Sequence, residues 1–260
     1  MRHPDWEELE AEAVALVHEA GERGLTLRVV GSTGIRIHCD AAASTMERVR
    51  RPAKDIDVVI RGGDRAGIRR MLEERGYAVD RDVLVAMEGT RFAFRHPATR
   101  VELDVFVDRL EFCHTIELGE RIVRHETTIP IEDLLLQKLQ IVEITRGDVA
   151  DAAVMLATHE VVEERAGPEQ VDGGYVARVL GRDWGFHRTA TDNLRRVRRA
   201  VETGAVRGLD AGAEAAVRDR AFMLLGLVDA APKSRSWRLR ARIGERVQWW
   251  DDVSEREDTY

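Results

Sequence analysis

The sequence predicts an α+β fold in which a mixed sheet with helices is followed by an α-helical C-terminal domain. Up to about Pro130, short apolar runs of strand length alternate with helical patterns, whereas later segments have the spacing of amphipathic helices. Apolar residues make up 44% of the 260 residues, which is enough for a large core. We therefore expect a first domain over residues 1–130, a helical domain over 131–250 and an acidic, frayed tail over 251–260.

The first part of the chain contains the expected strands. Apolar spacing, early acidic residues and closing glycines predict helices over 3–24, from Ser32 towards Ala43, and over 64–76. Strands are predicted over 25–30, 55–60 and twice within 91–108, with a turn at 96–100. The charged stretch 46–54 is expected to be a connector.

After Pro130 the strand signals disappear and helices are predicted over 131–144, 146–160, 169–180, 183–202, 211–228 and 236–247. This part is also basic. From Arg182 to Arg246 there are 15 Lys and Arg against 8 Asp and Glu, a net charge of +7, so the rest of the chain carries −14. Such a segment is suited to RNA or another polyanion, although its arginines could instead pair with the acidic remainder of the chain.

Composition also excludes several classes of protein. No stretch approaches the ~20 apolar residues that cross a bilayer, and the charged start differs from a signal peptide, so we expect a cytoplasmic protein without a membrane partner. The two cysteines, Cys39 and Cys113, lie far apart and have no metal-binding spacing. We expect two reduced, packed thiols and no structural zinc site.

Two neighbouring aspartates stand out in the predicted strand DIDVVI. Alternate strand residues point to the same side, so Asp55 and Asp57 face together while Ile56 and Val58 face the core. Two adjacent carboxylates repel each other, and a divalent cation such as Mg²⁺ would relieve the repulsion. The pair therefore suggests a metal site, although two solvated aspartates at a strand end would show the same pattern.

A later strand offers a third carboxylate. In VELDVFVD, Asp104 lies in the middle of the strand, where an acidic group without a partner is expensive to bury. Glu102 shares its face and is the alternative ligand, whereas Asp108 is better placed to cap the strand end. Upstream, Gly31 and Ser32 follow a strand and begin a helix, where backbone amides and the serine hydroxyl can face an anion.

Taken together, the glycine–serine junction, the aspartate pair and the third aspartate resemble the nucleotidyltransferase superfamily of DNA polymerase beta. The segment 129–156, IPIEDLLLQKLQIVEITRGDVADAAVML, is similar to the part that follows the catalytic sheet in the branch of AbiEii-type and MenT-type toxins. In that branch a lysine on the first helix and an aspartate near the start of the next belong to the active site. Lys138 matches the lysine, and Asp148, or else Asp151, matches the aspartate.

The resemblance implies a nucleotidyltransferase fold and transfer of an NMP from an NTP such as ATP to an acceptor hydroxyl. It implies Mg²⁺ or Mn²⁺ held by Asp55, Asp57 and Asp104, with Asp104 able to receive the acceptor proton. Gly31, Ser32 and Lys138 would then hold the β- and γ-phosphates.

The toxin relatives also imply an RNA acceptor, for example the 3′ end of a tRNA, and a cognate antitoxin. For the acceptor, arginines of the basic segment and Trp237 are candidates for phosphate and stacking contacts: Arg195, Arg196, Arg198, Arg199, Arg235, Arg238 and Arg240. Two alternatives remain open. One is an antibiotic-modifying nucleotidyltransferase of the same fold, and the other is a non-catalytic protein that binds nucleotides or RNA.

Overall fold

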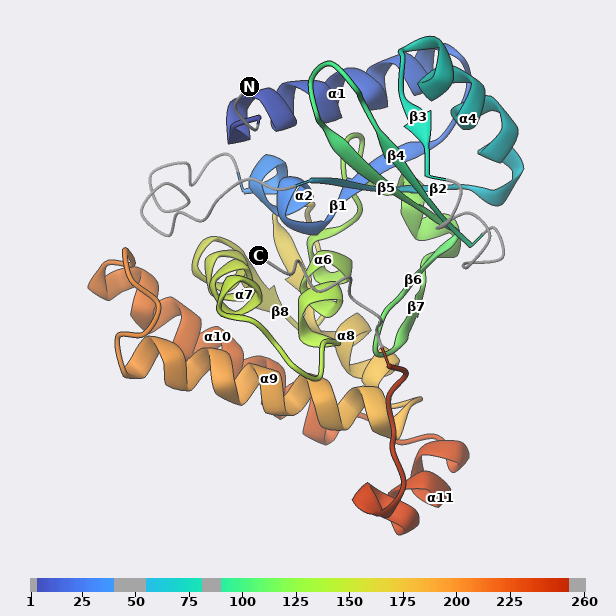
Figure 1. Ribbon diagram of the computed structural model, residues 1–260. Helices are drawn as coiled ribbons and strands as arrows, with labels where there is room; N and C mark the ends of the chain where they lie inside the picture. The colour runs from blue at the N-terminus through green and yellow to red at the C-terminus, as the bar shows by residue number, and fades with distance from the viewer. Residues whose placement is uncertain (1–3, 40–54, 81–89, 253–260) are drawn as a thin grey trace.

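The computed structural model describes residues 4–39, 55–80 and 90–252. In this part of the chain a five-stranded sheet has the order β1-β2-β5-β4-β3 (Figure 1). Only the central pair β2 and β5 is parallel, and the other neighbours run antiparallel, so the sheet is mixed as predicted. Its strands are β1 (Leu27–Val30), β2 (Ile56–Ile60), β3 (Ala78–Val79), β4 (Arg91–Arg95) and β5 (Glu102–Val107).

Helices cover both faces of the sheet (Figure 1). Leu9 and Leu16 of α1 pack with Val58 of β2 and with Met71 of α4 in one apolar cluster. The opposite face contacts α2 and the helices that follow Pro130, because Val59 belongs to a second cluster that extends into α6–α10. The helices of the first half are α1 (Trp6–Glu22), α2 (Gly31–His38) and α4 (Arg65–Glu74), with a 3-10 turn η2 (Gly62–Asp64).

The second half is mainly helical, as expected. Its helices are α6 (Ile131–Leu139), α7 (Arg146–Thr158), α8 (Gly173–Leu180), α9 (Trp184–Glu202), α10 (Ala211–Ala230) and α11 (Arg235–Ile243). Two 3-10 turns, η3 (Gly119–Val123) and η4 (Gly244–Arg246), precede α6 and follow α11. Within the described ranges, every helix is too short or too polar to span a lipid bilayer.

The expectation that strands end at Pro130 is wrong. A parallel pair, β8 (Glu160–Val162) and β9 (Gln170–Asp172), follows α7, and because β9 takes up the expected start of the next helix, α8 begins only at Gly173. A further hairpin of β6 (Arg109–Glu111) and β7 (Thr115–Glu117) was not predicted either. Strands of three residues are too short to produce a periodic signal.

Several helices end earlier than predicted, α11 for example at Ile243 rather than Val247. The helix expected over 131–144 stops at Leu139, because the Asn193 side-chain amide donates to the carbonyls of Leu139 and Ile141 at 2.9 and 2.7 Å and so caps the free end. Helix α2 ends at His38. Ala43, the expected end of that helix, and the predicted connector 46–54 lie outside the described residues.

Candidate active site

The three candidate carboxylates meet at the centre of the sheet. In the parallel pair of β2 and β5, Asp57 is directly opposite Asp104. Asp55 comes just before β2 and projects to the same side as Asp57. One carboxylate oxygen from each of the three residues lies within 4.8 Å of the others, and all three side chains are partly buried. The structure therefore places Asp55, Asp57 and Asp104 in one group.

The three neighbouring carboxylates repel one another, which disfavours the state in which all of them are ionised. Burial raises the pKa of Asp57 well above its usual range, and the neighbouring carboxylates of Asp55 and Asp104 raise it further. Lys138 and Arg91 oppose this rise in the pKa without cancelling it. A hard divalent cation with a preference for carboxylate oxygens, such as Mg²⁺, would relieve the repulsion, so the donor set fits this metal.

Gly31 allows the start of α2 to lie directly against the carboxylates. Its backbone has φ +64°, and a Cβ at this position would overlap the Oδ2 of Asp57. Its N–H donates to the Oε1 of Gln137 at 2.9 Å. Thr33 fixes the first turn of α2 further, because its hydroxyl donates to the backbone carbonyl of Asp55 at 3.1 Å. Only glycine combines this backbone conformation with such a close approach.

Replacement of Gly31 by alanine tests this contact. Gly31→Ala is expected to lower the free energy of unfolding by about 1–2 kcal/mol, because the left-handed backbone is unfavourable for alanine. Any activity that depends on the carboxylate group should fall by about 10²-fold, since the new methyl group displaces Asp57. Urea unfolding and initial rates measure the two effects. Gly63→Ala is the control, because a Cβ there meets nothing within 4 Å. Equal behaviour of the two variants would contradict the assigned contact.

Lys138 links the serine of α2 to the two candidate aspartates of α7. Its Nζ donates to the Ser32 hydroxyl at 3.1 Å and lies 3.0 Å from carboxylate oxygens of both Asp148 and Asp151. Ser32 in turn donates to Asp151 at 2.8 Å. The structure thus brings both aspartates to Lys138 and does not select one of them.

The two aspartates differ in their second role. Asp148 also forms a capping box with Thr145 at the start of α7. Burial opposes ionisation of Asp148, but the charge of Lys138 and the hydrogen bonds from Thr145 outweigh it, so its pKa lies below the ordinary value. Asp151 is more deeply buried and contacts Ser32 directly. Asp151 is therefore the closer of the two to the start of α2.

Two side chains at the site were not predicted. Arg91 of β4 donates to the Oδ2 of Asp104 at 2.7 Å, and Gln137 accepts from Gly31. The alternation of RFAFR in 91–95 places Arg91 and Ala93 on one face of β4. Because Ala93 pairs with Asp104 in the hairpin, this pattern was a signal for Arg91 near Asp104. Gln137 had no such signal, since it stands 106 residues from Gly31 in the sequence.

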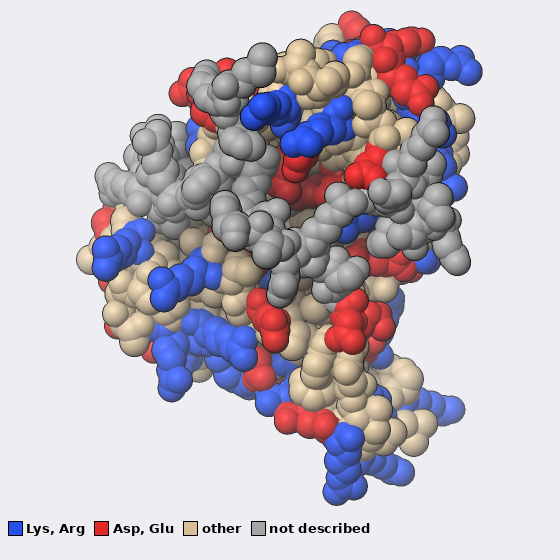
Figure 2. Space-filling model, in the orientation of Figure 1, with Lys and Arg blue, Asp and Glu red and all other residues tan. Residues whose placement is uncertain are grey.

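The other acidic candidates lie outside the group. Glu102 pairs with Arg95 at 3.2 Å on the exposed part of β5. Asp108 accepts from the backbone N–H of Gly62 at 2.8 Å, in agreement with the expected cap of the strand end. Figure 2 shows acidic side chains at the bottom of a recess on this face of the molecule.

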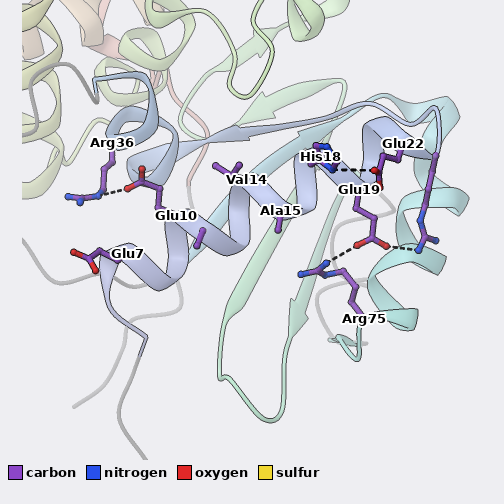
Figure 3. A pocket seen from close by; sticks show the side chains of 11 residues that line it. Glu7, Glu10, Val14, Ala15, His18, Glu19, Glu22, Arg36 and Arg75 are labelled. Atoms are coloured by element: carbon purple, nitrogen blue, oxygen red, sulfur yellow. Dashed lines mark hydrogen bonds and ion pairs between the residues drawn. The ribbon is translucent and has the colours of Figure 1, made fainter.

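A separate groove runs along the exposed side of α1 (Figure 3). Its charged side chains pair with each other, as Arg36 does with Glu10 and Arg75 with Glu19, both at less than 3 Å. None of the candidate site residues lines this groove. It has no part in the site described above.

The predicted basic surface is partly neutralised within its own helix. Arg195 and Arg198 pair with Asp192 and Glu202. Arg196, Arg199, Arg235 and Arg238 are exposed, whereas the guanidinium of Arg240 stacks on Trp184 and donates to backbone carbonyls. In the view of Figure 2, Lys and Arg side chains gather over α9.

Trp237, the candidate for base stacking, is only half-exposed. His187 packs edge-on against its ring at 5.2 Å and Lys233 lies 5.7 Å from the ring centre. Both cysteines are buried thiols, as expected.

Comparisons with known proteins do not assign the chain to a family. No protein-family model and no curated protein matches it. One solved structure that matches is a tRNA-processing enzyme in an apo form, with 16% sequence identity, a TM-score of 0.31 and coverage of 96% of this chain and 61% of that one. This chain thus spans about three fifths of that enzyme's length. At this TM-score the match carries no weight for fold or function.

Proposed function

We propose that this protein is a metal-dependent nucleotidyltransferase that moves an NMP from an NTP to an acceptor hydroxyl. The observation that supports this proposal most is the group of Asp55, Asp57 and Asp104, from two adjacent parallel strands, beside the Gly31 end of α2. The same residues carry the resemblance to the nucleotidyltransferase superfamily of DNA polymerase beta. The geometry and the sequence pattern therefore support the same reaction.

Asp55, Asp57 and Asp104 would hold the metal, Mg²⁺ or Mn²⁺. When bound, such ions lower the pKa of an attacking hydroxyl and neutralise charge on the leaving pyrophosphate. Asp104 is fixed by Arg91 through one oxygen, Oδ2, which leaves Oδ1 to accept the proton of the acceptor hydroxyl. Arg91 thus orients the carboxylate that would act as the base.

The start of α2 would receive the triphosphate. Ser32 and Lys138 provide a hydroxyl and a compact positive charge, the groups that bind phosphate oxygens. Asp148 and Asp151 hold the Lys138 ammonium in place, at 3.0 Å each. This arrangement supports a positioning role for both aspartates.

For the acceptor we propose RNA, a tRNA in particular. Helix α9 packs against the connection between α6 and α7, where Asn193 holds the carbonyl of Ile141 and Arg196 donates to that of Val142. The exposed arginines of α9 therefore adjoin the connection that runs from Lys138 to Asp148. Arginine binds phosphates as a planar, bidentate donor, which suits a nucleic-acid backbone.

The reaction can be tested with labelled NTPs and Mg²⁺, offered with total tRNA and, in parallel, with aminoglycosides and lincosamides. We expect label on tRNA and release of pyrophosphate. Label on an antibiotic instead would support the antibiotic-modifying alternative. Binding of Mn²⁺ and NTP, seen as a thermal shift, without transfer to any acceptor would favour the non-catalytic alternative and overturn the proposal.

A further inference from the structure

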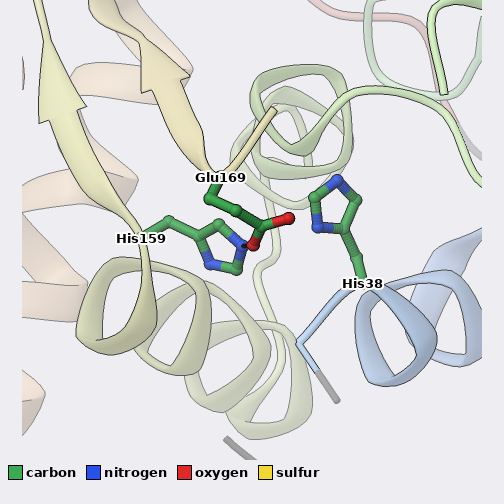
Figure 4. A group of neighbouring side chains, drawn as sticks. All are labelled: His38, His159 and Glu169. Atoms are coloured by element: carbon green, nitrogen blue, oxygen red, sulfur yellow. Dashed lines mark ion pairs between the residues drawn. The ribbon is translucent and has the colours of Figure 1, made fainter. Parts of the chain in front are cut away.

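A second group of ligand-type side chains lies at the other end of α2. His38 is the last residue of this helix, His159 follows α7, and Glu169 comes directly before β9. One ligand atom from each lies within 4.8 Å of the others. Figure 4 shows the carboxylate of Glu169 between the two imidazole rings. No motif in the sequence indicates this group, because His38 stands about 120 residues before His159 and Glu169.

The two histidines are buried with ring nitrogens that lack hydrogen-bond partners. The exposed fractions of His38 and His159 are 8% and 3%. Both ring nitrogens of His38, and the Nε2 of His159, have no hydrogen bond in the described structure. The Oε2 of Glu169 lies 3.5 Å from that Nε2, which is beyond a good hydrogen bond. Buried polar atoms almost always have a hydrogen-bond partner or another ligand, so we expect a ligand at these three nitrogens.

Both rings are suited to metal binding. Both rings are buried, and burial favours the neutral form of an imidazole. Neutral imidazole is the form that binds metals. The Nδ1 of His159 lies 2.8 Å from the Thr158 hydroxyl, a contact that fixes the ring with its Nε2 towards Glu169.

We propose that His38, His159 and Glu169 form a zinc site, with water as the fourth ligand. Two imidazole nitrogens and one carboxylate oxygen are a ligand set that Zn²⁺ accepts, whereas Mg²⁺ prefers oxygen alone. The neighbouring Cys39 is not one of the ligands, since it does not belong to the group whose ligand atoms all lie within 4.8 Å of one another.

The site would act as a clamp. It joins the end of α2 to the β8–β9 pair, segments that are about 120 residues apart in the sequence. Because the opposite end of α2 carries Gly31, zinc would stabilise the helix that contacts the carboxylate group. A ligand that binds only the folded chain raises its stability by mass action. Zinc binding is independent of whether the chain transfers nucleotides.

The test is titration of EDTA-treated, dialysed protein with Zn²⁺ in the presence of excess Mg²⁺, which occupies the carboxylate group. We expect about one Zn²⁺ per chain by elemental analysis, a higher melting temperature and, with Co²⁺ as a probe, the intense visible absorption of a four-coordinate site. Glu169→Gln and His159→Gln should each weaken the affinity by about 10- to 100-fold.

Glu164→Gln is the matched control, because Glu164 is exposed in the same β8–β9 connection and its substitution removes the same charge as Glu169→Gln. It should bind zinc as the unmodified chain does. Should His159→Gln fail to fold, Glu169→Gln decides alone, since its side chain is exposed and its loss leaves the core intact. Equal zinc affinity of Glu169→Gln and Glu164→Gln would overturn the proposal, as would zinc binding that is lost in Asp57→Asn.

Discussion

Asp57→Asn is expected to lower the rate of NMP transfer by about 10³-fold or more while the chain stays folded. The substitution removes one of three carboxylates that would hold the metal, and metal ions supply several kcal/mol of stabilisation to the transition state. Initial rates with labelled NTP at saturating Mg²⁺ measure the loss. Glu102→Gln is the control, because Glu102 lies on β5 near Asp104 but pairs with Arg95 outside the group, and its rate should stay within about twofold.

The Asp57→Asn variant should be more stable than the unmodified chain when metal is absent. A carboxyl whose pKa is raised on folding destabilises the folded state at pH above its ordinary pKa, and the penalty vanishes in acid. Asparagine carries no charge and avoids the penalty. At neutral pH in EDTA we expect a gain on the order of 1 kcal/mol, or about 2–4 °C in melting temperature, together with loss of the stabilisation by Mg²⁺. Retained transfer within tenfold would refute the assigned role.

Local patterns predicted the faces of the central strands. Alternation in 55–60 and 101–108 separated Asp57 and Asp104 from the apolar residues that face α1 and α4, and the structure confirms this separation. What the alternation did not contain is the register. Asp57 lies directly opposite Asp104 because β2 and β5 pair in parallel. Helix α4 and the strands β3 and β4 separate them in sequence, so their pairing is a property of the topology.

Contacts between distant segments set the features that could not be predicted. The end of α6 is fixed by Asn193, more than 50 residues later, while the apolar spacing of 131–144 alone favours a longer helix. The strands β8 and β9 stabilise each other as a pair, and neither has a pattern of its own. Of the residues named from the resemblance, Lys138 and Asp151 both contact Ser32, and Asp148 pairs with Lys138. Arg91 and Gln137 became visible only with the sheet and α6 in place.

Arg121→Met is expected to destabilise the chain by about 3–5 kcal/mol, since buried Asp133 loses its charged partner and Glu132 keeps only the longer contact with Arg165 at 3.3 Å. Arg121 contacts Glu132 at 2.6 Å and Asp133 at 2.6 Å, and both carboxylates are at most 1% exposed. The ring of Tyr175 lies 3.6 Å from its guanidinium. Urea unfolding measures the loss. Arg124→Met, an exposed change in the same segment, should shift the free energy of unfolding by less than about 0.5 kcal/mol.

The loss at Arg121 should reach the candidate active site through α6. Glu132 and Asp133 form the first turn of this helix, which carries Gln137 and Lys138 towards α2. Burial raises the pKa of Asp133 to about 6 although Arg121 opposes the rise, so the pKa of this carboxyl should rise further without the arginine. Arg121→Met should therefore lower transfer and stability together, whereas Asp57→Asn lowers transfer and raises the stability of the metal-free chain. A destabilisation below about 1 kcal/mol would show that other contacts fix the start of α6.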